Sequence, residues 1–220
     1  MYKVIPKLEA IQHVKDGITL MVGGFNTGGD PNELVEALRT KTKVRDLVLV
    51  NIDAGVNGSP LTKMVGEKRF RKVIATFFAA NKEIQKQVTQ NEIEYELVPQ
   101  GTFAERIRCA GAGLGGFLTP TGVGTVVEEG KQKIEVDGKE YLLEKPLRGD
   151  VAFIRADIAD EIGNLVIFGN AKNTNTVMAM AADYVVAQAN KIVKVGEIDP
   201  QDVTVPSVYV DAVVLAGEEI

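Results

Sequence analysis

The sequence is poor in the residues that build disulfides and metal centres. Its 220 residues include one cysteine, Cys109, one histidine, His13, and no tryptophan. A single cysteine excludes an internal disulfide and fits a reducing cytoplasm. One cysteine and one histidine are also too few for a zinc cluster, and neither belongs to a Ser-His-Asp or Cys-His pattern. We therefore expect no metal site, and we expect His13 to be a surface or boundary residue.

Long apolar runs and excess positive charge are also absent. No run reaches the roughly 18 residues that a membrane helix needs, and the N-terminal residues lack the apolar core of a signal peptide. The net charge is −5, so the phosphates of a nucleic acid would be repelled. A hydrophobic content of 45% is that of an ordinary globular protein. These features predict a cytoplasmic protein with no membrane or nucleic-acid partner and a sizeable core, which we interpret as a single domain spanning 1–220.

Short apolar runs alternate with amphipathic segments along the chain. We expect strands at 18–22, 47–50, 73–76, 95–98, 151–156, 164–168, 185–186 and 208–215. We expect helices at 7–15, 31–42, 82–90, 103–109 (with Thr102 as its N-cap) and 172–182. This alternation predicts an α/β fold with a mostly parallel sheet flanked by helices. The Asp137-Gly138 pair lies between two alternating segments and predicts an antiparallel hairpin inserted at about 131–145.

A glycine-rich turn follows the first expected strand. Gly23 and Gly24 come directly after the apolar run, Phe25 follows, and Gly28, Gly29 and Pro31 lead into the next helix. Glycine permits positive φ and close approach of a ligand to the backbone. A helix that begins at Pro31 would add free N–H groups and a partial positive charge. The turn is therefore a candidate site for a carbonyl, carboxylate or phosphate.

A second glycine-rich segment, 110–130, has seven glycines in 21 residues. Such a segment cannot be one regular element, yet it is too apolar for a disordered linker, so we expect an ordered loop at a functional face. It contains a Gly-x-Gly-x-x-Gly pattern at Gly111, Gly113 and Gly116. Because the pattern follows a helix and precedes none, it does not indicate a nicotinamide site.

Several blocks of the sequence together resemble the alpha subunits of the class I coenzyme A-transferases. The blocks are Asp16-Gly17, Gly23-Gly24-Phe25 with Gly29 and Pro31, Pro99-Gln100-Gly101-Thr102, Glu105-Arg106-Ile107-Arg108, the run from Gly111 to Gly130, Gly149-Asp150, Gly163-Asn164, Asn173 and Ala181-Ala182-Asp183. The likeness spans nearly the whole chain and is greatest to subunits of the acetate/acetoacetate/butyrate type. Two positions depart from the family pattern, namely Ile52, where relatives carry a polar Asn, and Asp30, which is usually apolar.

The resemblance implies transfer of coenzyme A from a short-chain acyl-CoA to acetate, acetoacetate or butyrate, with the acyl-CoA as substrate and no permanently bound cofactor. The family's nucleophilic glutamate belongs to a Ser-Glu-Asn-Gly block of the beta subunit, and this sequence lacks that block. No catalytic nucleophile is therefore expected on this chain, and a beta subunit is expected as its partner, as α₂β₂ or a larger assembly. The resemblance places Gly23, Gly24, Phe25 and Gln100 at the substrate or oxyanion. Loop residues Gly29, Asp53, Gly115, Gly116 and Phe117 would line the site.

Two other functions remain open on the sequence. A sugar-phosphate isomerase of related fold would need Lys or Arg at the glycine turn, and 16–31 contains neither. A non-catalytic acyl-CoA-binding subunit is the second alternative. The Glu128-Glu129-Gly130 segment only superficially resembles the catalytic block.

Overall fold

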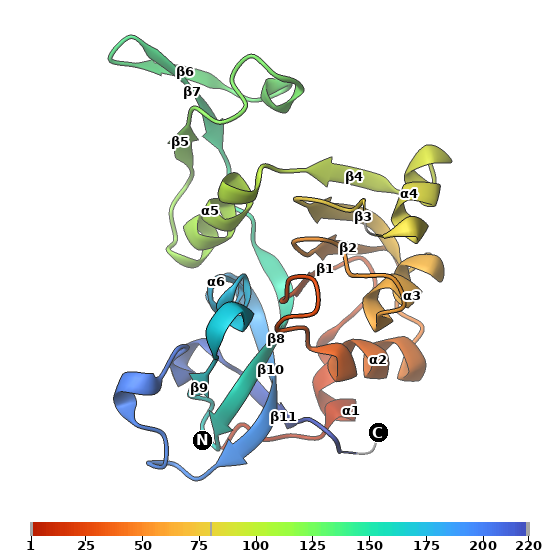
Figure 1. Ribbon diagram of the computed structural model, residues 1–220, viewed down its shortest axis with the longest axis vertical. Helices are drawn as coiled ribbons and strands as arrows, with labels where there is room; N and C mark the ends of the chain where they lie inside the picture. The colour runs from red at the N-terminus through yellow and green to blue at the C-terminus, as the bar shows by residue number, and fades with distance from the viewer. Residues whose placement is uncertain (1, 80, 219–220) are drawn as a thin grey trace.

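The computed structural model describes residues 2–79 and 81–218. One eight-stranded sheet forms its centre (Figure 1). A single path runs in the spatial order β11 (Ala212–Leu215), β10 (Ala182–Val193), β8 (Gly149–Asp160), β1 (Thr19–Val22), β2 (Leu47–Val50), β3 (Phe70–Ala75) and β4 (Glu94–Leu97). Neighbours on this path pair in parallel, and the short β9 (Leu165–Val166) adds antiparallel to β8. The predicted α/β fold with a mostly parallel sheet is confirmed.

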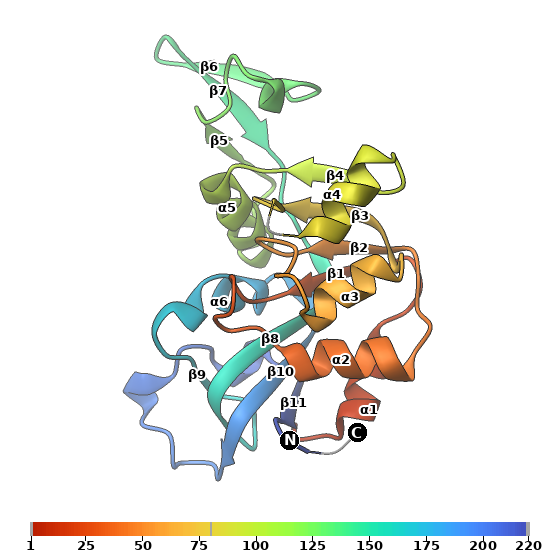
Figure 2. The ribbon, with the colours of Figure 1, turned by 45° about the vertical axis from the view of Figure 1, so that its right-hand side comes forward.

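The central strands are apolar because both faces of the sheet are covered. All four residues of β2 are buried, as expected for a parallel strand between two layers of helices. Alternate residues enter separate clusters: Met21 packs with Phe103 and Ile107, whereas Leu20 packs with Leu34 on the other face. The covering helices are α1 (Lys7–Ala10), α2 (Asn32–Lys41), α3 (Pro60–Gly66) and α4 (Lys82–Thr89) on one side, and α5 (Gln100–Gly111) and α6 (Asn175–Met178) on the other (Figure 2).

A small antiparallel sheet projects from this body as an arm (Figures 1 and 2). Its order is β5 (Phe117–Thr119), β7 (Lys139–Glu144) and β6 (Lys133–Val136). Asp137 and Gly138 both have positive φ, 50° and 75°, as a two-residue turn of this kind requires. The predicted hairpin is confirmed. The expectation of a single ordered loop over 110–130 is wrong in part, because β5 and a 3₁₀ turn at Val126–Glu128 lie within it.

Several predicted boundaries are wrong. Helix α5 begins at Gln100 with Pro99 as its N-cap, so Thr102 lies in the first turn and does not cap the helix. The expected helix 172–182 is replaced by a 3₁₀ turn (Gly169–Lys172) and the short α6, since Asn173 has a non-helical backbone (φ 3°, ψ −111°). The strand predicted at 208–215 begins only at Ala212, after a 3₁₀ turn at Ser207–Tyr209.

The first helix is shorter than predicted, and its C-terminal end is a 3₁₀ turn (Ile11–His13). His13 is exposed and stacks on Tyr184 with ring centroids 3.6 Å apart, which confirms its place at the surface. Helix α3 was not predicted, although Ser59 caps it by accepting a hydrogen bond from the Thr62 N–H.

Candidate functional site

The candidate site lies where neighbouring strands of the parallel sheet end. Because β1, β2, β3 and β4 run parallel, the loops that follow them lie along one edge of the sheet. These loops carry Phe25 after β1, Asp53 after β2, Phe77 after β3 and Gln100 after β4. In open α/β sheets this edge is the usual place of ligand binding.

The glycine turn after β1 is a tight reversal of the backbone. The Phe25 N–H donates to the Gly28 carbonyl at 3.0 Å, and the Gly28 N–H donates back to the Phe25 carbonyl at 2.9 Å. Asn26, at the tip, has a φ of 58°. The Phe25 side chain is 48% exposed, so this turn presents a large apolar group to solvent.

The glycines of the turn are required by contacts within the chain. A Cβ on Gly23 would lie 1.8 Å from Asn175 Oδ1, and one on Gly29 would lie 2.7 Å from Asn175 Nδ2. A Cβ on Gly24, where φ is +108°, would lie 2.4 Å from Asp30 Oδ1. The missing Cβ atoms therefore have an internal cause, and a ligand is not needed to explain them.

Buried polar side chains hold the turn from below. Asp53 is 4% exposed, and its carboxylate accepts the Asn26 N–H at 2.6 Å and the Gly55 N–H at 2.9 Å. Asn175 Nδ2 donates to the Gly29 carbonyl at 2.9 Å. Asp53 thus shapes the turn through hydrogen bonds, while the role of Asn175 was not predicted. The one sequence signal for it is an amide near the start of a segment of small residues, 172–182.

Backbone N–H groups at the start of helix α2 already have a hydrogen-bond acceptor within the chain. Pro31 is its N-cap, and the helix begins at Asn32. Gln188, from β10, accepts the N–H groups of Glu33 and Leu34 on its Oε1 at 3.0 and 3.1 Å. The prediction that this helix start offers its free N–H groups to an anion is therefore wrong for these two groups.

Asp30 is an unusual residue at this site. Its Oδ2 is buried and has no hydrogen-bond partner in the part of the chain that the structure describes. Burial raises the pKa of Asp30 to about 6, and the nearby Asp53 acts in the same direction. An unpaired buried carboxylate is costly, so the neutral acid is favoured.

Gln100 is exposed at the first residue of α5, and within residues 2–79 and 81–218 its side chain has no hydrogen-bond partner. Its amide group therefore forms no hydrogen bond with its own turn. The next residues, Gly101 and Thr102, line a groove of about 430 Å³ together with Glu105 of α5 and the β5 segment that contains Phe117.

The predicted site residues fall into two groups that α6 joins. One group is Gly23, Gly24, Phe25, Gly29 and Asp53, which lie around the first turn. The other is Gln100, Gly115, Gly116 and Phe117, in α5 and the segment that leads into β5. Helix α6 touches the first group through Asn175, and Met180, just after it, lies against Gly111 of α5. Gly115 is exposed, and Gly116 lies against the Glu144 carbonyl at the base of the arm.

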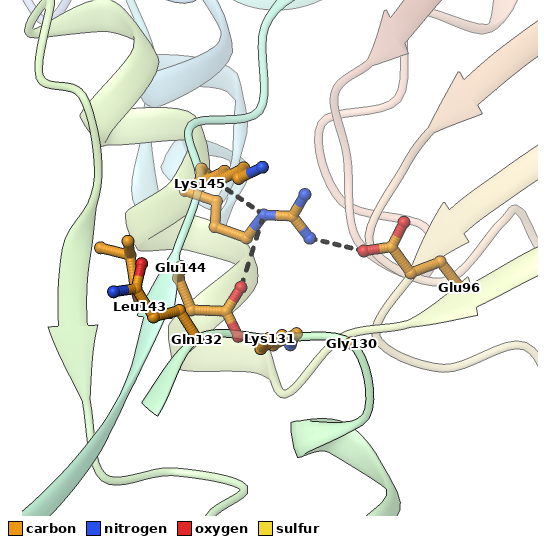
Figure 3. A pocket seen from close by; sticks show the side chains of 8 residues that line it. Glu96, Gly130, Lys131, Gln132, Leu143, Glu144 and Lys145 are labelled. Carbon is orange, nitrogen blue, oxygen red and sulfur yellow. Dashed lines mark hydrogen bonds and ion pairs between the residues drawn. The ribbon is translucent and has the colours of Figure 1, made fainter. Parts of the chain in front are cut away.

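A charged hollow lies at the base of the arm (Figure 3). Arg106 of α5 pairs with Glu96 at 2.6 Å and donates to the Lys145 carbonyl at 2.9 Å, while the buried Glu144 pairs with Lys131 at 2.5 Å. Burial would raise the pKa of Glu96, but hydrogen bonds from Arg106 and Lys72 hold it below its ordinary value. The charged groups of this cluster pair with one another, which indicates that their role is to hold the arm against α5.

No group of three or more His, Cys, Asp or Glu side chains in the part of the chain that the structure describes is arranged to hold a metal ion. No helix in that part of the chain is long and apolar enough to span a membrane.

Comparison with known proteins gives concordant results. The family model of coenzyme A transferase matches residues 8–216. The chain is 44% identical to the acetate CoA-transferase subunit alpha of Escherichia coli K12, over 98% of both chains. It is 40% identical to the acetoacetyl-CoA:acetate/butyrate CoA transferase alpha subunit of Clostridium acetobutylicum, over 91% of both chains.

Solved structures agree. An acyl-CoA transferase from E. coli O157:H7, in a thioester complex with CoA, superposes with a TM-score of 0.87 at 25% identity. That match covers 100% of this chain and 48% of the solved one, so this chain spans about half the length of that relative. The glutaconate CoA-transferase of Acidaminococcus fermentans shares the fold, with a TM-score of 0.86 at 24% identity over 97% of this chain and 75% of the solved one. This chain belongs to the coenzyme A transferase family.

Proposed function

We propose that this chain is the alpha subunit of a CoA-transferase that moves coenzyme A from a short-chain acyl-CoA to acetate, acetoacetate or butyrate. One observation carries the proposal: the chain is similar, from end to end, to relatives that are themselves named as alpha subunits of such enzymes. We also propose that residues 1–220 act as one CoA-transferase domain.

The nucleophile is assigned to a separate beta subunit, because this sequence lacks the Ser-Glu-Asn-Gly block. A glutamate carboxylate attacks the thioester carbonyl, and the CoA thiolate leaves to give an acyl-glutamyl anhydride. The thiolate then attacks the glutamyl carbonyl, which releases the first acid and leaves a glutamyl-CoA thioester. The second acid reverses these steps and departs as the new acyl-CoA. Each step passes through an oxyanion that aligned dipoles stabilise.

This chain has two groups suited to such an oxyanion. The Gly24 N–H donates to no acceptor in the described part of the chain, whereas the neighbouring N–H groups of Gly23 and Phe25 are both used within it. The Gln100 amide is also unpaired. We assign Gly24 and Gln100 as donors toward the reacting groups.

The remaining predicted residues shape the pocket around these donors. Phe25 and Phe117 provide apolar walls that keep water from the thioester. Gly23, Gly29 and Asp53 hold the first turn, as their contacts with Asn175 and Asn26 support. Gly115 and Gly116 lie in the second loop, between α5 and β5, and line the pocket from that side.

The proposed assembly is a hetero-oligomer, α₂β₂ or larger, with coenzyme A bound only as a substrate and no permanent cofactor. The subunit names of the relatives support a beta partner. Cys109 is buried and unpaired, which agrees with a cytoplasmic location.

The isomerase alternative is not favoured. A phosphate would need cations or free helix N–H groups at the turn, yet residues 16–31 contain no Lys or Arg. Two N–H groups at the start of α2 are also taken by Gln188.

The test is reconstitution. The chain is co-expressed with a CoA-transferase beta subunit that carries the Ser-Glu-Asn-Gly block, and transfer of CoA is measured from acetyl-, butyryl- and acetoacetyl-CoA to each of the other acids. We expect transfer by the mixture and none by either subunit alone. A non-catalytic binding subunit would instead bind acyl-CoA in the mixture without transfer to any acid, and the proposal would be rejected.

A further inference from the structure

Asp30 occupies the space that a side chain at position 24 would fill. The position of a Cβ on Gly24 is 2.4 Å from Asp30 Oδ1 and 3.0 Å from Asp30 Cα. Asp30 also lies directly before Pro31, the N-cap of α2. Its carboxyl group is thus wedged between the glycine turn and the start of the helix, and it limits how far the Gly24 backbone can move.

Two carboxyl groups lie close together under the turn, and their surroundings differ. Both oxygens of Asp53 accept backbone N–H groups, from Asn26 and Gly55, at 2.6 and 2.9 Å. Both oxygens of this buried carboxyl group are thus hydrogen-bonded, as buried polar groups usually are. Asp30 Oδ2 is buried and accepts no hydrogen bond in the part of the chain that is described. Asp30 therefore has fewer donors than Asp53, because only its own backbone N–H supports its charged form and its Oδ2 has no partner. Burial of such a carboxyl group favours the neutral acid.

Few charged groups face Asp30 from the surrounding elements. The loop after β2 contributes Asp53, and β8 contributes Arg155. Arg155 lies 3.5 Å from Asp157, so its charge is shared with another carboxylate. The segment around α6 adds the neutral amide of Asn175, which contacts Gly23 and Gly29. Burial and Asp53 together raise the pKa of Asp30 to about 6, against the opposing effects of its own backbone N–H and of Arg155.

We propose that Asp30 is a positioning residue that works as a neutral carboxylic acid, wedged beneath Gly24 so that the Gly24 N–H and Phe25 keep their direction. The effect of Asp30 on catalysis rests on the proposed transferase function. The protonation of Asp30 is independent of that function. The residue would not touch the substrate, since its free oxygen is buried behind the turn.

The consequence is a defined dependence on pH. The pKa of Asp30 is higher in the folded chain, at about 6, than its ordinary value of 3.8. The stability that its proton contributes is therefore complete below pH 3.8 and is lost as the pH rises through about 6. A partner subunit that covers the turn would remove more water and shift the pKa further in the same direction.

The test compares three forms of the assembled alpha–beta enzyme between about pH 4 and pH 8. Asp30→Asn keeps the shape of the side chain and removes its titration. Asp202→Asn removes the same charge from an exposed 3₁₀ turn (Pro200–Asp202) and is the matched control. The measurements are the melting temperature, the infrared band of protonated carboxyl groups with isotope-labelled aspartate, and kcat/KM for CoA transfer.

We expect the Asp30→Asn enzyme to gain about 2–8 °C in melting temperature over wild type as the pH rises through the titration. Its kcat/KM should remain level while that of wild type falls several-fold, and the Asp202→Asn enzyme should follow wild type. The wild-type infrared spectrum should show a protonated aspartate that disappears on the alkaline side and is missing in Asp30→Asn.

Three results would overturn the proposal. Identical pH profiles of wild type and Asp30→Asn exclude a titrating Asp30. Absence of the infrared band of a protonated aspartate in wild type also excludes a titrating Asp30, and this result does not depend on whether the Asp30→Asn variant folds. A change in melting temperature without any change in the pH profile of kcat/KM leaves Asp30 only a structural residue. Melting and infrared spectra need no turnover, so they remain informative if the chain transfers no CoA.

Discussion

At the scale of single residues, glycine can be required for two different reasons: a positive φ, or a neighbouring atom that leaves no room for a Cβ. Gly24 and Gly58 both have positive φ, +108° and +85°, which a side chain adopts only with strain. A Cβ on Gly58 meets nothing within 4 Å, whereas one on Gly24 meets Asp30 at 2.4 Å. Comparison of the two positions therefore isolates the contact from the backbone conformation.

We expect Gly24→Ala to lower CoA transfer by the assembled enzyme more than tenfold, because the added methyl group displaces Asp30 and turns the Gly24 N–H. Gly58→Ala should cost only the strain of its backbone, about 1–2 kcal/mol of stability, and should transfer CoA normally. The measurements are initial rates and melting curves. Equal activity of the two variants would mean that the contact with Asp30 does not matter.

Gln100 gives a second expectation at this scale. Removal of one neutral donor to an oxyanion costs about 3–4 kcal/mol at most, or roughly 10²–10³ in rate. Gln100→Ala should therefore be slow yet still form the glutamyl-CoA intermediate. Gln90→Ala, an exposed glutamine at the end of α4, is the control and should behave as wild type. Unchanged kinetics of Gln100→Ala with two different acids would remove Gln100 from the site.

Sequence patterns predict which residues form the candidate site, but they do not explain why glycine is needed at some of its positions. The sequence alone predicts that glycine at 23 and 24 leaves room for a ligand beside the backbone. The structure assigns that room to Asn175 and Asp30. A contact between residues 23 and 175 cannot be predicted from local sequence patterns, because the residues adjacent to each of them give no information about the other.

At the scale of elements, the accuracy of prediction followed the strength of the local signal. The buried strand β2 is a continuous run of Leu and Val and was predicted at its true bounds. Helix α3 is only seven residues long and buries three apolar side chains, Leu61, Met64 and Val65, which is too short a pattern to show a helical period. The long strands β8 and β10 were predicted too short because charged residues interrupt their apolar runs, such as Asp157 and Asp160 in β8 and Lys191 in β10.

The cap of α2 provides a test at this scale. Gln188 lies in β10, far away in sequence, and is 4% exposed while it accepts two N–H groups of the helix. Gln188→Ala leaves both N–H groups buried without an acceptor, so we expect a loss of about 1–3 kcal/mol in the free energy of unfolding. Gln201→Ala, at an exposed position, should change it by less than about 0.5 kcal/mol. A urea titration monitored by circular dichroism compares the two, and equal midpoints would show that water replaces the cap.

At the scale of the whole molecule, the chain exposes aromatic side chains along the edge of the sheet that holds the candidate site. Phe25 is 48% exposed at the glycine turn, and Phe77 is 52% exposed after β3 on the same edge of the sheet. The solved acyl-CoA transferase that this chain resembles is about twice as long, and its match covers 48% of that chain. Exposed aromatic groups at this edge are consistent with the proposal that a beta subunit covers the surface.

The location of the covalent intermediate tests this view directly. If the nucleophile belongs to the beta subunit, none of the 30 acidic residues of this chain carries the glutamyl-CoA thioester. Borohydride reduces a thioester to an alcohol and so marks the glutamate permanently. We expect reduction in the presence of acyl-CoA to inactivate the assembled enzyme and to modify a single glutamate, on the beta chain.

Glu128 and Glu129 are the matched controls on this chain, because they are followed by Gly130 and superficially resemble the catalytic block. Glu128 already accepts the Gly124 N–H at 2.6 Å within the arm, which is a structural use of its carboxylate. Glu128→Gln and Glu129→Gln should leave both the labelling and the rate of transfer unchanged. Mass spectrometry of peptides from both subunits identifies the reduced residue. A label on Glu128, Glu129 or any other residue of this chain, or transfer by this chain alone, would show that it carries its own nucleophile.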